Sequence, residues 1–218
     1  MRREQIAIAL PKGRLLIDAI QFFEDAGIHG LDGLRRSRRL LCEDAAGAYR
    51  FLVLRPADIP TYVEYGATDM GVVGKDILLE QERDIYEPLD LKFGACRLVV
   101  AQPKNLQDRG GPGGWSSLRV ATKYPSLAER YFTERGVQVE IIRLSGSLEL
   151  APLAGLCDRI VDLVATGRTL RENGLVEVEE IATATARLIV NRAALKTKYQ
   201  RVRELIDRLK AAVQGEGA

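Results

Sequence analysis

Short apolar runs alternate with amphipathic stretches along nearly the whole chain. Unbroken runs such as residues 6–10 and 160–165 are typical of strands that a parallel sheet buries on both faces. Apolar residues that recur every three or four positions, as in 16–23 and 202–209, predict helices. The expected strands are 6–10, 51–54, 70–73, 97–101, 118–121, 137–142, 160–165 and 188–190. This alternation predicts an α/β fold with doubly wound sheets. The element lengths favour two small lobes, with a ligand in a cleft at the carboxyl ends of the strands.

Three residues mark expected helix boundaries. Asp58 precedes the stretch that runs toward Tyr65, and Ser126 precedes the stretch that ends near Gly136. Both are predicted N-caps because their side-chain oxygens can accept from the first free amides of a helix. Gly27 is expected to end the first helix.

Composition narrows the classes of function. The 218 residues include 32 Lys and Arg against 30 Asp and Glu, so the net charge of +2 gives no general attraction to nucleic acid or a membrane. No apolar stretch approaches the ~20 residues that span a bilayer, and no apolar signal region follows Met1. The three cysteines are far apart, and the only histidine is His29. We therefore expect a cytoplasmic protein with buried, reduced thiols and no zinc site.

The segment 162–169 is the strongest candidate for a binding site. An apolar strand that carries Asp162 leads into Thr166-Gly167-Arg168-Thr169, and a short helix is expected to follow. A turn rich in Gly and Thr at a helix start offers backbone N–H groups and hydroxyls to a phosphate, without a large side chain in the way. Asp162 is placed to accept hydrogen bonds from ribose hydroxyls.

A plain helix cap would give the same turn, so the turn alone does not decide for phosphate. The carboxylate on an otherwise apolar strand favours a functional site, because a buried charge needs a partner or a task. The segment matches neither a Walker A loop nor a G-x-G-x-x-G fingerprint.

Cations follow two other expected strands. Lys12 and Arg14 flank Gly13 after the first strand, and Arg55 follows the second. Surface cations without a role would explain either position alone. With cations after two strands, a binding site for an anion explains the pattern as well as surface cations without a role do.

Two further segments leave alternatives open. The run Arg35-Arg36-Ser37-Arg38-Arg39 fits a solvated face, a nucleic-acid contact or a basic hairpin that reaches a polyphosphate. Nucleic acid is the weakest of these, because no aromatic residues interleave. Glu149 precedes an expected helix, where its carboxylate fits a role with the helix dipole or as a ligand to ribose or Mg²⁺. Spacing alone favours the dipole role.

Together these segments resemble the catalytic subunit of ATP phosphoribosyltransferase, the enzyme that begins histidine biosynthesis, in its short form. The resemblance covers nearly the whole chain. The matching segments are 9–14, 37–40, 55–60, 71–76, 121–125, 146–152 and 162–175.

The resemblance implies a reaction. N1 of the adenine of ATP attacks C1 of phosphoribosyl pyrophosphate, and pyrophosphate leaves with inversion, accompanied by Mg²⁺. A ring nitrogen with a lone pair needs no strong base, whereas the charge on the departing pyrophosphate calls for fixed cations. A chain with one histidine and many arginines fits this chemistry.

The resemblance also implies roles for residues of this sequence. Thr166, Gly167, Arg168 and Thr169 would hold the 5′-phosphate, and Asp162 and Glu149 would contact the ribose. Lys12, Arg14 and Arg55 would face the pyrophosphate or the triphosphate of ATP, and Arg38 would join them, either in the same chain or from a neighbouring subunit. No residue is assigned as a metal ligand.

The implied fold is the two-lobed, type II periplasmic-binding-protein-like architecture, in which the chain crosses between the lobes twice. Residues 1–93 and 182–218 would form the first lobe, and 94–181 the second, which carries the phosphate cradle. The short form works with a separate regulatory subunit that resembles histidyl-tRNA synthetase, and self-association is expected.

Two other functions fit parts of the sequence. A solute-binding or sensor domain of the same fold would bind a small anion without chemistry. An export signal or an attached DNA-binding module would favour that function. A nucleic-acid binder that uses residues 35–39 would show steeply salt-dependent binding.

Overall fold

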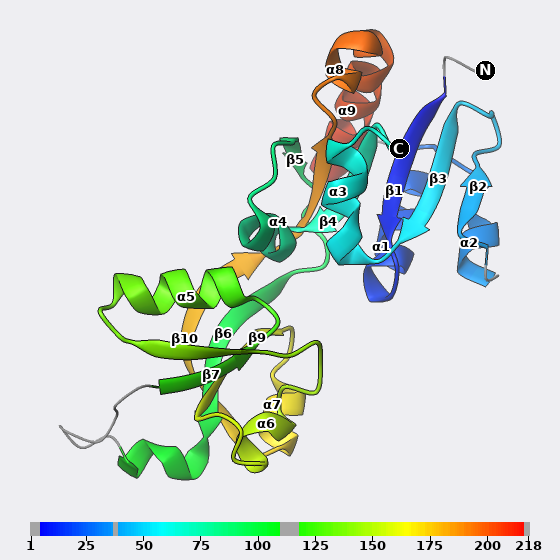
Figure 1. Ribbon diagram of the computed structural model, residues 1–218. Coiled ribbons are helices and arrows are strands. Elements are labelled where there is room, and N and C mark those ends of the chain that lie inside the picture. Colours follow the sequence, from blue (N-terminus) through cyan, green and yellow to red (C-terminus); the bar gives the residue numbers. More distant parts are fainter. Residues whose placement is uncertain (1–4, 37–38, 110–117, 216–218) are drawn as a thin grey trace. The chain divides into compact units, whose positions relative to one another are not determined.

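The computed structural model describes residues 5–36, 39–109 and 118–215, and the packing of the chain divides it into two compact units (Figure 1). Unit 1 comprises residues 1–78, 82–94 and 185–218, and unit 2 comprises 79–81 and 95–184. Each unit has its own mixed β-sheet. The sequence placed the lobe boundaries after residues 93 and 181, and that division into two lobes stays a prediction.

Unit 1 is built on a six-stranded sheet in the order β2-β3-β1-β4-β11-β5. The central strand β1 pairs in parallel with β3 and β4, while β2, β11 and β5 join antiparallel. The strand bounds are β1 Ile6–Pro11, β2 Leu41–Glu43, β3 Tyr49–Leu54, β4 Met70–Gly74, β5 Tyr86–Asp90 and β11 Ala186–Val190.

Helices cover both faces of this sheet. Ile8 and Leu10 pack with α1 and α9 on one face, whereas Ala9 packs with Ile59 and Val63 of α3 on the other. Because both faces are covered, the β1 sequence is apolar without a break. The helix bounds are α1 Arg14–Asp25, α2 Asp32–Arg36, η1 Pro56–Asp58, α3 Ile59–Glu64, α4 Lys75–Gln81, α8 Ala194–Thr197 and α9 Tyr199–Gln214.

Unit 2 is built on a five-stranded sheet in the order β10-β6-β9-β7-β8. β7 pairs in parallel with β8 and β9, and β6 runs antiparallel to both β9 and β10. The strand bounds are β6 Cys96–Pro103, β7 Leu118–Thr122, β8 Val139–Arg143, β9 Arg159–Val164 and β10 Leu175–Ala184.

The second sheet is also covered on both faces (Figure 1). Val161 of β9 packs with Phe132 of α5 on one face, and Ile160 packs with Ala151 of α6 and Leu170 of α7 on the other. The doubly wound arrangement expected from the alternating pattern is therefore confirmed in each unit. The bounds of the helices are η2 Lys104–Arg109, α5 Pro125–Glu134, α6 Leu150–Leu153 and α7 Arg168–Glu172. None of the helices in the described part of the chain has the length and apolar character that a bilayer crossing requires.

The strands that the apolar pattern did not predict, β2, β5 and β10, all lie at sheet edges. β2 has only three residues, β5 contains a proline, and β10 carries exposed Glu177, Glu179 and Glu180. Short length, proline and charge are the features that protect an edge from pairing with another chain. They also remove the apolar signal on which the prediction relied.

Of the two predicted N-caps, Asp58 takes the N-cap position of α3, but its side chain makes no capping hydrogen bond. The prediction for Ser126 is wrong, because Ser126 lies inside α5, which begins at Pro125. The amides of Ser126 and Leu127 instead donate to the two carboxylate oxygens of Glu80, at 3.0 and 2.9 Å. Gly27 has a φ of +75°, the left-handed conformation expected just after the end of α1.

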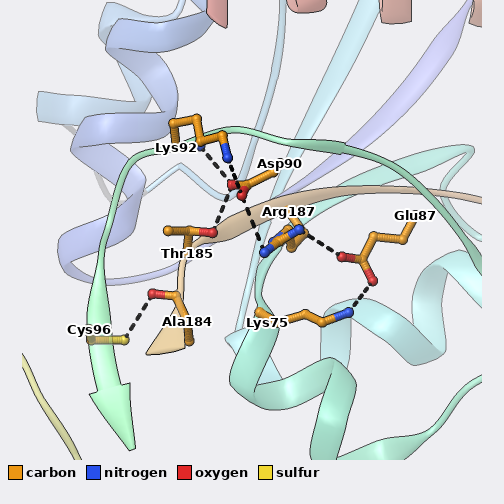
Figure 2. A network of polar contacts seen from close by, with 8 residues as sticks. All are labelled: Lys75, Glu87, Asp90, Lys92, Cys96, Ala184, Thr185 and Arg187. Carbon is orange, nitrogen blue, oxygen red and sulfur yellow. Dashed lines mark hydrogen bonds and ion pairs between the residues drawn. The ribbon is translucent and has the colours of Figure 1, made fainter. Parts of the chain in front are cut away.

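A polar network holds the end of β5 against β11 in unit 1 (Figure 2). The Asp90 carboxylate accepts hydrogen bonds from the Thr185 hydroxyl at 2.7 Å and from the Lys92 amine at 2.9 Å. Arg187 pairs with Asp90 and with Glu87, each at 3.3 Å. Because Thr185 is the first residue of the chain's return to unit 1, the network fixes both crossing segments on the unit 1 side.

The three cysteines are free thiols, but only Cys157 is buried, and Cys42 and Cys96 are partly exposed. The expectation of three buried thiols is therefore wrong for two of them. Burial raises the pKa of the Cys42 and Cys157 thiols, which keeps them protonated and unreactive near neutral pH.

Candidate active site

The turn between β9 and α7 is the predicted phosphate cradle. Gly167 precedes α7 with a φ of +70°, a left-handed conformation that disfavours any other residue. A Cβ at this position would lie 2.7 Å from Glu177 Oε1 and 2.9 Å from Arg171 Nη1. Thr166 and Thr169 are exposed on either side. Because the amides in the first turn of a helix lack partners within the helix, this turn presents donors to an anion.

Arg168 contacts the turn through its backbone and Glu172 through its side chain. Its amide lies 3.4 Å from the Thr166 hydroxyl oxygen, and its side chain pairs with Glu172 at 2.7 Å along α7. The Arg168 side chain is 79% exposed, so this pair is easily broken by solvent or by a ligand.

Asp162 stands on β9, upstream of the cradle, and has a charged partner. Its Oδ1 atom accepts from the Leu163 amide at 2.8 Å and lies 3.2 Å from the Lys123 amine. Lys123 directly follows β7, the parallel neighbour of β9. The sequence pointed to segment 121–125 as part of the resemblance, but it gave Lys123 no role because the pairing of β7 with β9 is not visible in a sequence.

Glu149 directly precedes α6 and makes no capping hydrogen bond. Its neighbours Leu148 and Ala151 share an apolar cluster with Leu170 of α7. Glu149 therefore belongs to the same face of the unit 2 sheet as the cradle. A carboxylate at a helix start fits the helix dipole and leaves its oxygens available to a ligand.

The cations of unit 1 lie where its central parallel strands end. The Lys12 amide donates to the Leu54 carbonyl at 2.7 Å, and Pro11 and Leu54 are partners in the parallel pair β1–β3. Lys12 and Arg55 therefore follow the carboxyl ends of two neighbouring parallel strands. Arg14 begins α1 after Gly13, whose φ of +99° and ψ of −149° are accessible essentially to glycine alone.

These cations have charge available for a ligand. In residues 5–36, 39–109 and 118–215, Lys12, Arg14 and Arg55 form no ion pair and are all exposed. Arg35, by contrast, pairs with Glu24 at 3.0 Å, so part of the basic run 35–39 is already neutralised. Arg38 lies outside the described residues.

Comparison with known proteins identifies a matching family and similar sequences. The family model for HisG, ATP phosphoribosyltransferase, matches residues 55–211. The ATP phosphoribosyltransferase of Geobacter metallireducens is 56% identical over 208 residues, which are 95% of this chain and 98% of that protein.

Solved structures support the fold. The ATP phosphoribosyl transferase (HisG:HisZ) complex from Thermotoga maritima has a chain with a TM-score of 0.81 and 35% identity, covering 97% of this chain and 100% of that one. The alkanesulfonate-binding protein SsuA from Xanthomonas axonopodis pv. citri, bound to MOPS, gives a TM-score of 0.57 at 12% identity, over 96% of this chain and 73% of that one. At that identity the second likeness concerns the fold alone.

The predicted α/β, periplasmic-binding-protein-like fold is thus confirmed, and so is the predicted pentosyl transfer. Since the family model covers most of the sequence and the Geobacter relative matches over nearly its whole length, the chain belongs to the ATP phosphoribosyltransferase family, whose reaction is the first step of histidine biosynthesis.

Proposed function

We propose a division of labour for this family's reaction in this chain. The turn after β9 in unit 2 holds the 5′-phosphate of phosphoribosyl pyrophosphate. The cations at the strand ends of unit 1 take the charge of the pyrophosphate and of the ATP triphosphate. The observation that carries the proposal is the left-handed Gly167 at the start of α7, with a hydroxyl residue on each side of the turn.

The cradle suits the end of the substrate that does not react. Backbone amides at a helix start bind a phosphate by hydrogen bonds and by the local dipole, without changing its chemistry. Thr166 and Thr169 add hydroxyl donors. Asp162, which lies on β9 four residues before Thr166, is assigned to the ribose hydroxyls, and Glu149 to the same sugar.

The unit 1 cations suit the end that does react. As the bond from C1 to pyrophosphate breaks, negative charge grows on the leaving group. Lys12, Arg14 and Arg55 carry fixed positive charge that no carboxylate of the described residues neutralises. Removal of one such group typically lowers the rate roughly 10²–10³-fold. Arg38 is assigned to the same role.

The nucleophile needs no general base, because N1 of adenine already carries a lone pair. His29, the only histidine, is an exposed loop residue after α1 and has no part in this proposal.

We assign Mg²⁺ to the substrate pyrophosphate. In the described part of the chain, no group of three or more His, Cys, Asp or Glu residues is arranged to hold a metal. This fits Mg²⁺, which commonly binds through substrate phosphates, water and one or two carboxylates. Glu149 is the carboxylate that the sequence left open as a ligand for the ion, which would offset the charge of the leaving group.

The partner assignment follows from the similar structure. The Thermotoga maritima protein is a HisG:HisZ complex. We extend that pairing to this chain, as a catalytic subunit that associates with itself and with a regulatory subunit resembling histidyl-tRNA synthetase. We place the complex in the cytoplasm, where a biosynthetic transferase meets its nucleotide substrates.

The direct test is an assay with ATP, phosphoribosyl pyrophosphate and Mg²⁺, with and without the regulatory subunit. We expect pyrophosphate and phosphoribosyl-ATP in equal amounts. Binding of phosphoribosyl pyrophosphate without product, even with the partner present, would instead favour a solute-binding domain of the same fold.

The cradle assignment has its own test in Thr169→Ala. Loss of a hydroxyl donor to the 5′-phosphate should raise the KM for phosphoribosyl pyrophosphate by roughly tenfold, while the KM for ATP changes less than about twofold. Equal changes in both KM values would remove the cradle assignment.

A further inference from the structure

Lys123 lies beside the proposed ribose and phosphate site but has no role in the division of labour described above. It directly follows β7, and its amine lies 3.2 Å from Asp162 Oδ1 on β9. Because β7 and β9 are parallel neighbours, with Thr122 opposite Val161, Lys123 and the cradle leave the sheet at the same edge.

The backbone around Lys123 is held firmly. The buried Thr122 hydroxyl donates to the Val161 carbonyl at 2.7 Å and accepts from the Tyr124 amide at 2.9 Å. Tyr124 is itself buried, and the Leu144 amide donates to the Thr122 carbonyl at 3.0 Å. One hydroxyl thus ties the end of β7 to β9 on one side of Lys123 and to the start of α5 on the other. The backbone of Lys123 is therefore held in place beside β9, the strand that carries Asp162.

We infer that Lys123 is a positioning residue for the phosphoribosyl substrate, acting through Asp162. This inference rests on the proposed function. Lys123 engages one oxygen of the Asp162 carboxylate, together with the Leu163 amide, and so fixes the orientation of the group. The other oxygen remains for the ribose hydroxyls.

The competing account is an ordinary surface ion pair. The Lys123 side chain is 38% exposed, and pairs at such exposure add little to stability. That account predicts no specific change in substrate affinity. The positioning role predicts a change confined to the sugar substrate, so the two are separable by kinetics.

The test compares Lys123→Met with Lys123→Arg in the complex with the regulatory subunit. Lys123→Met should raise the KM for phosphoribosyl pyrophosphate about tenfold and leave the KM for ATP within about twofold. Lys123→Arg keeps the charge and should restore most of the affinity. Lys92→Met serves as the matched control, because Lys92 is also paired with an aspartate, at 2.9 Å, and should leave both KM values unchanged.

A double variant shows whether Lys123 acts through Asp162. If it does, Lys123→Met should add less than about twofold to the loss caused by Asp162→Asn alone. Fully multiplicative losses would overturn the inference.

Thr169→Ala separates this inference from the proposed function. If Thr169→Ala weakens phosphoribosyl pyrophosphate and Lys123→Met does not, the inference fails and the cradle stands. If neither variant affects that substrate, the proposed site itself fails.

Discussion

At the scale of single residues, the proposed phosphate cradle of unit 2 depends on a backbone conformation that glycine adopts with the least strain. Gly167 turns the chain from β9 into α7 with a φ of +70°. Gly174, just after α7, has nearly the same φ, +71°, but its missing Cβ faces open space. The two glycines therefore differ in surroundings and not in backbone.

This contrast gives a matched pair of variants. Gly167→Ala and Gly174→Ala should each lower the free energy of unfolding by about 1 kcal/mol, because alanine is strained at positive φ. Only Gly167→Ala brings a methyl group against Glu177 and Arg171 beside the predicted cradle, so only this variant should raise the KM for phosphoribosyl pyrophosphate, by tenfold or more. Urea unfolding and steady-state kinetics on both proteins provide the check. A similar KM rise in Gly174→Ala would mean that strain in α7, and not the cradle itself, controls binding.

The residue scale also shows what a sequence can and cannot indicate about the site. The charge of Asp162 on an apolar strand and the turn from Thr166 to Thr169 are visible as local patterns. The partner of Asp162 is not, since Lys123 is brought to it by pairing between β7 and β9. Lys12 and Arg55, which the sequence assigned to one anion site, follow β1 and β3, and these strands are parallel neighbours. Local patterns are therefore visible in a sequence, whereas a contact made through strand pairing, such as that of Lys123 with Asp162, is not.

At the scale of elements, the central strands were predictable because burial on both faces leaves an unbroken apolar run. Of the edge strands, β8 was predicted, but β2, β5 and β10 were not, as β10 illustrates with its exposed glutamates. The prediction of the residue that caps α5 was wrong for a different reason. A local rule expects a capping oxygen from the chain just before the helix, but here Glu80 of α4 supplies both oxygens from 46 and 47 residues away.

The Glu80 cap leads to a stability prediction. Glu80→Ala removes the acceptor for two amides at the start of α5, and we expect a loss of about 1 kcal/mol in the free energy of unfolding. The control is Glu129→Ala, which removes an exposed carboxylate from α5 itself. Chemical denaturation of both variants gives the comparison. Equal stability of Glu80→Ala and the unmodified protein would show that solvent caps α5 as well as the carboxylate does.

At the scale of the whole molecule, each unit has its own sheet and its own core. In unit 1 a polar network centres on Asp90. Burial would raise the pKa of its carboxyl, but hydrogen bonds from Lys92 and Thr185, with the charge of Arg187, outweigh burial and lower the pKa to about 2. The ordinary value of an unfolded aspartate is about 3.9.

The depressed pKa of Asp90 predicts an acid-sensitive contribution to stability. Because the folded pKa is lower than the unfolded one, the contribution is fully present above about pH 4 and is lost as pH falls toward 2. Asp90→Asn should therefore be less stable than the unmodified protein at pH 7, by up to about 2 kcal/mol, with the difference shrinking between pH 4 and 2. Asp207→Asn, in a pair that is 66% exposed on both sides, should show no such difference. A constant difference from pH 7 to pH 2 would exclude Asp90 as the source.

The same variants test whether the two units unfold independently, a question that the predicted division into two lobes leaves open. Asp90 anchors unit 1, whereas Glu80 and the helix that it caps belong to unit 2. If the units open independently, Asp90→Asn should speed amide hydrogen exchange in β1, β4 and β11 and leave β7 and β9 unchanged. Glu80→Ala should do the reverse. Hydrogen exchange read by mass spectrometry resolves these strands in one experiment. Faster exchange in both sheets from either variant would show that the chain unfolds as one cooperative unit, and the predicted domain boundaries would then have no thermodynamic meaning.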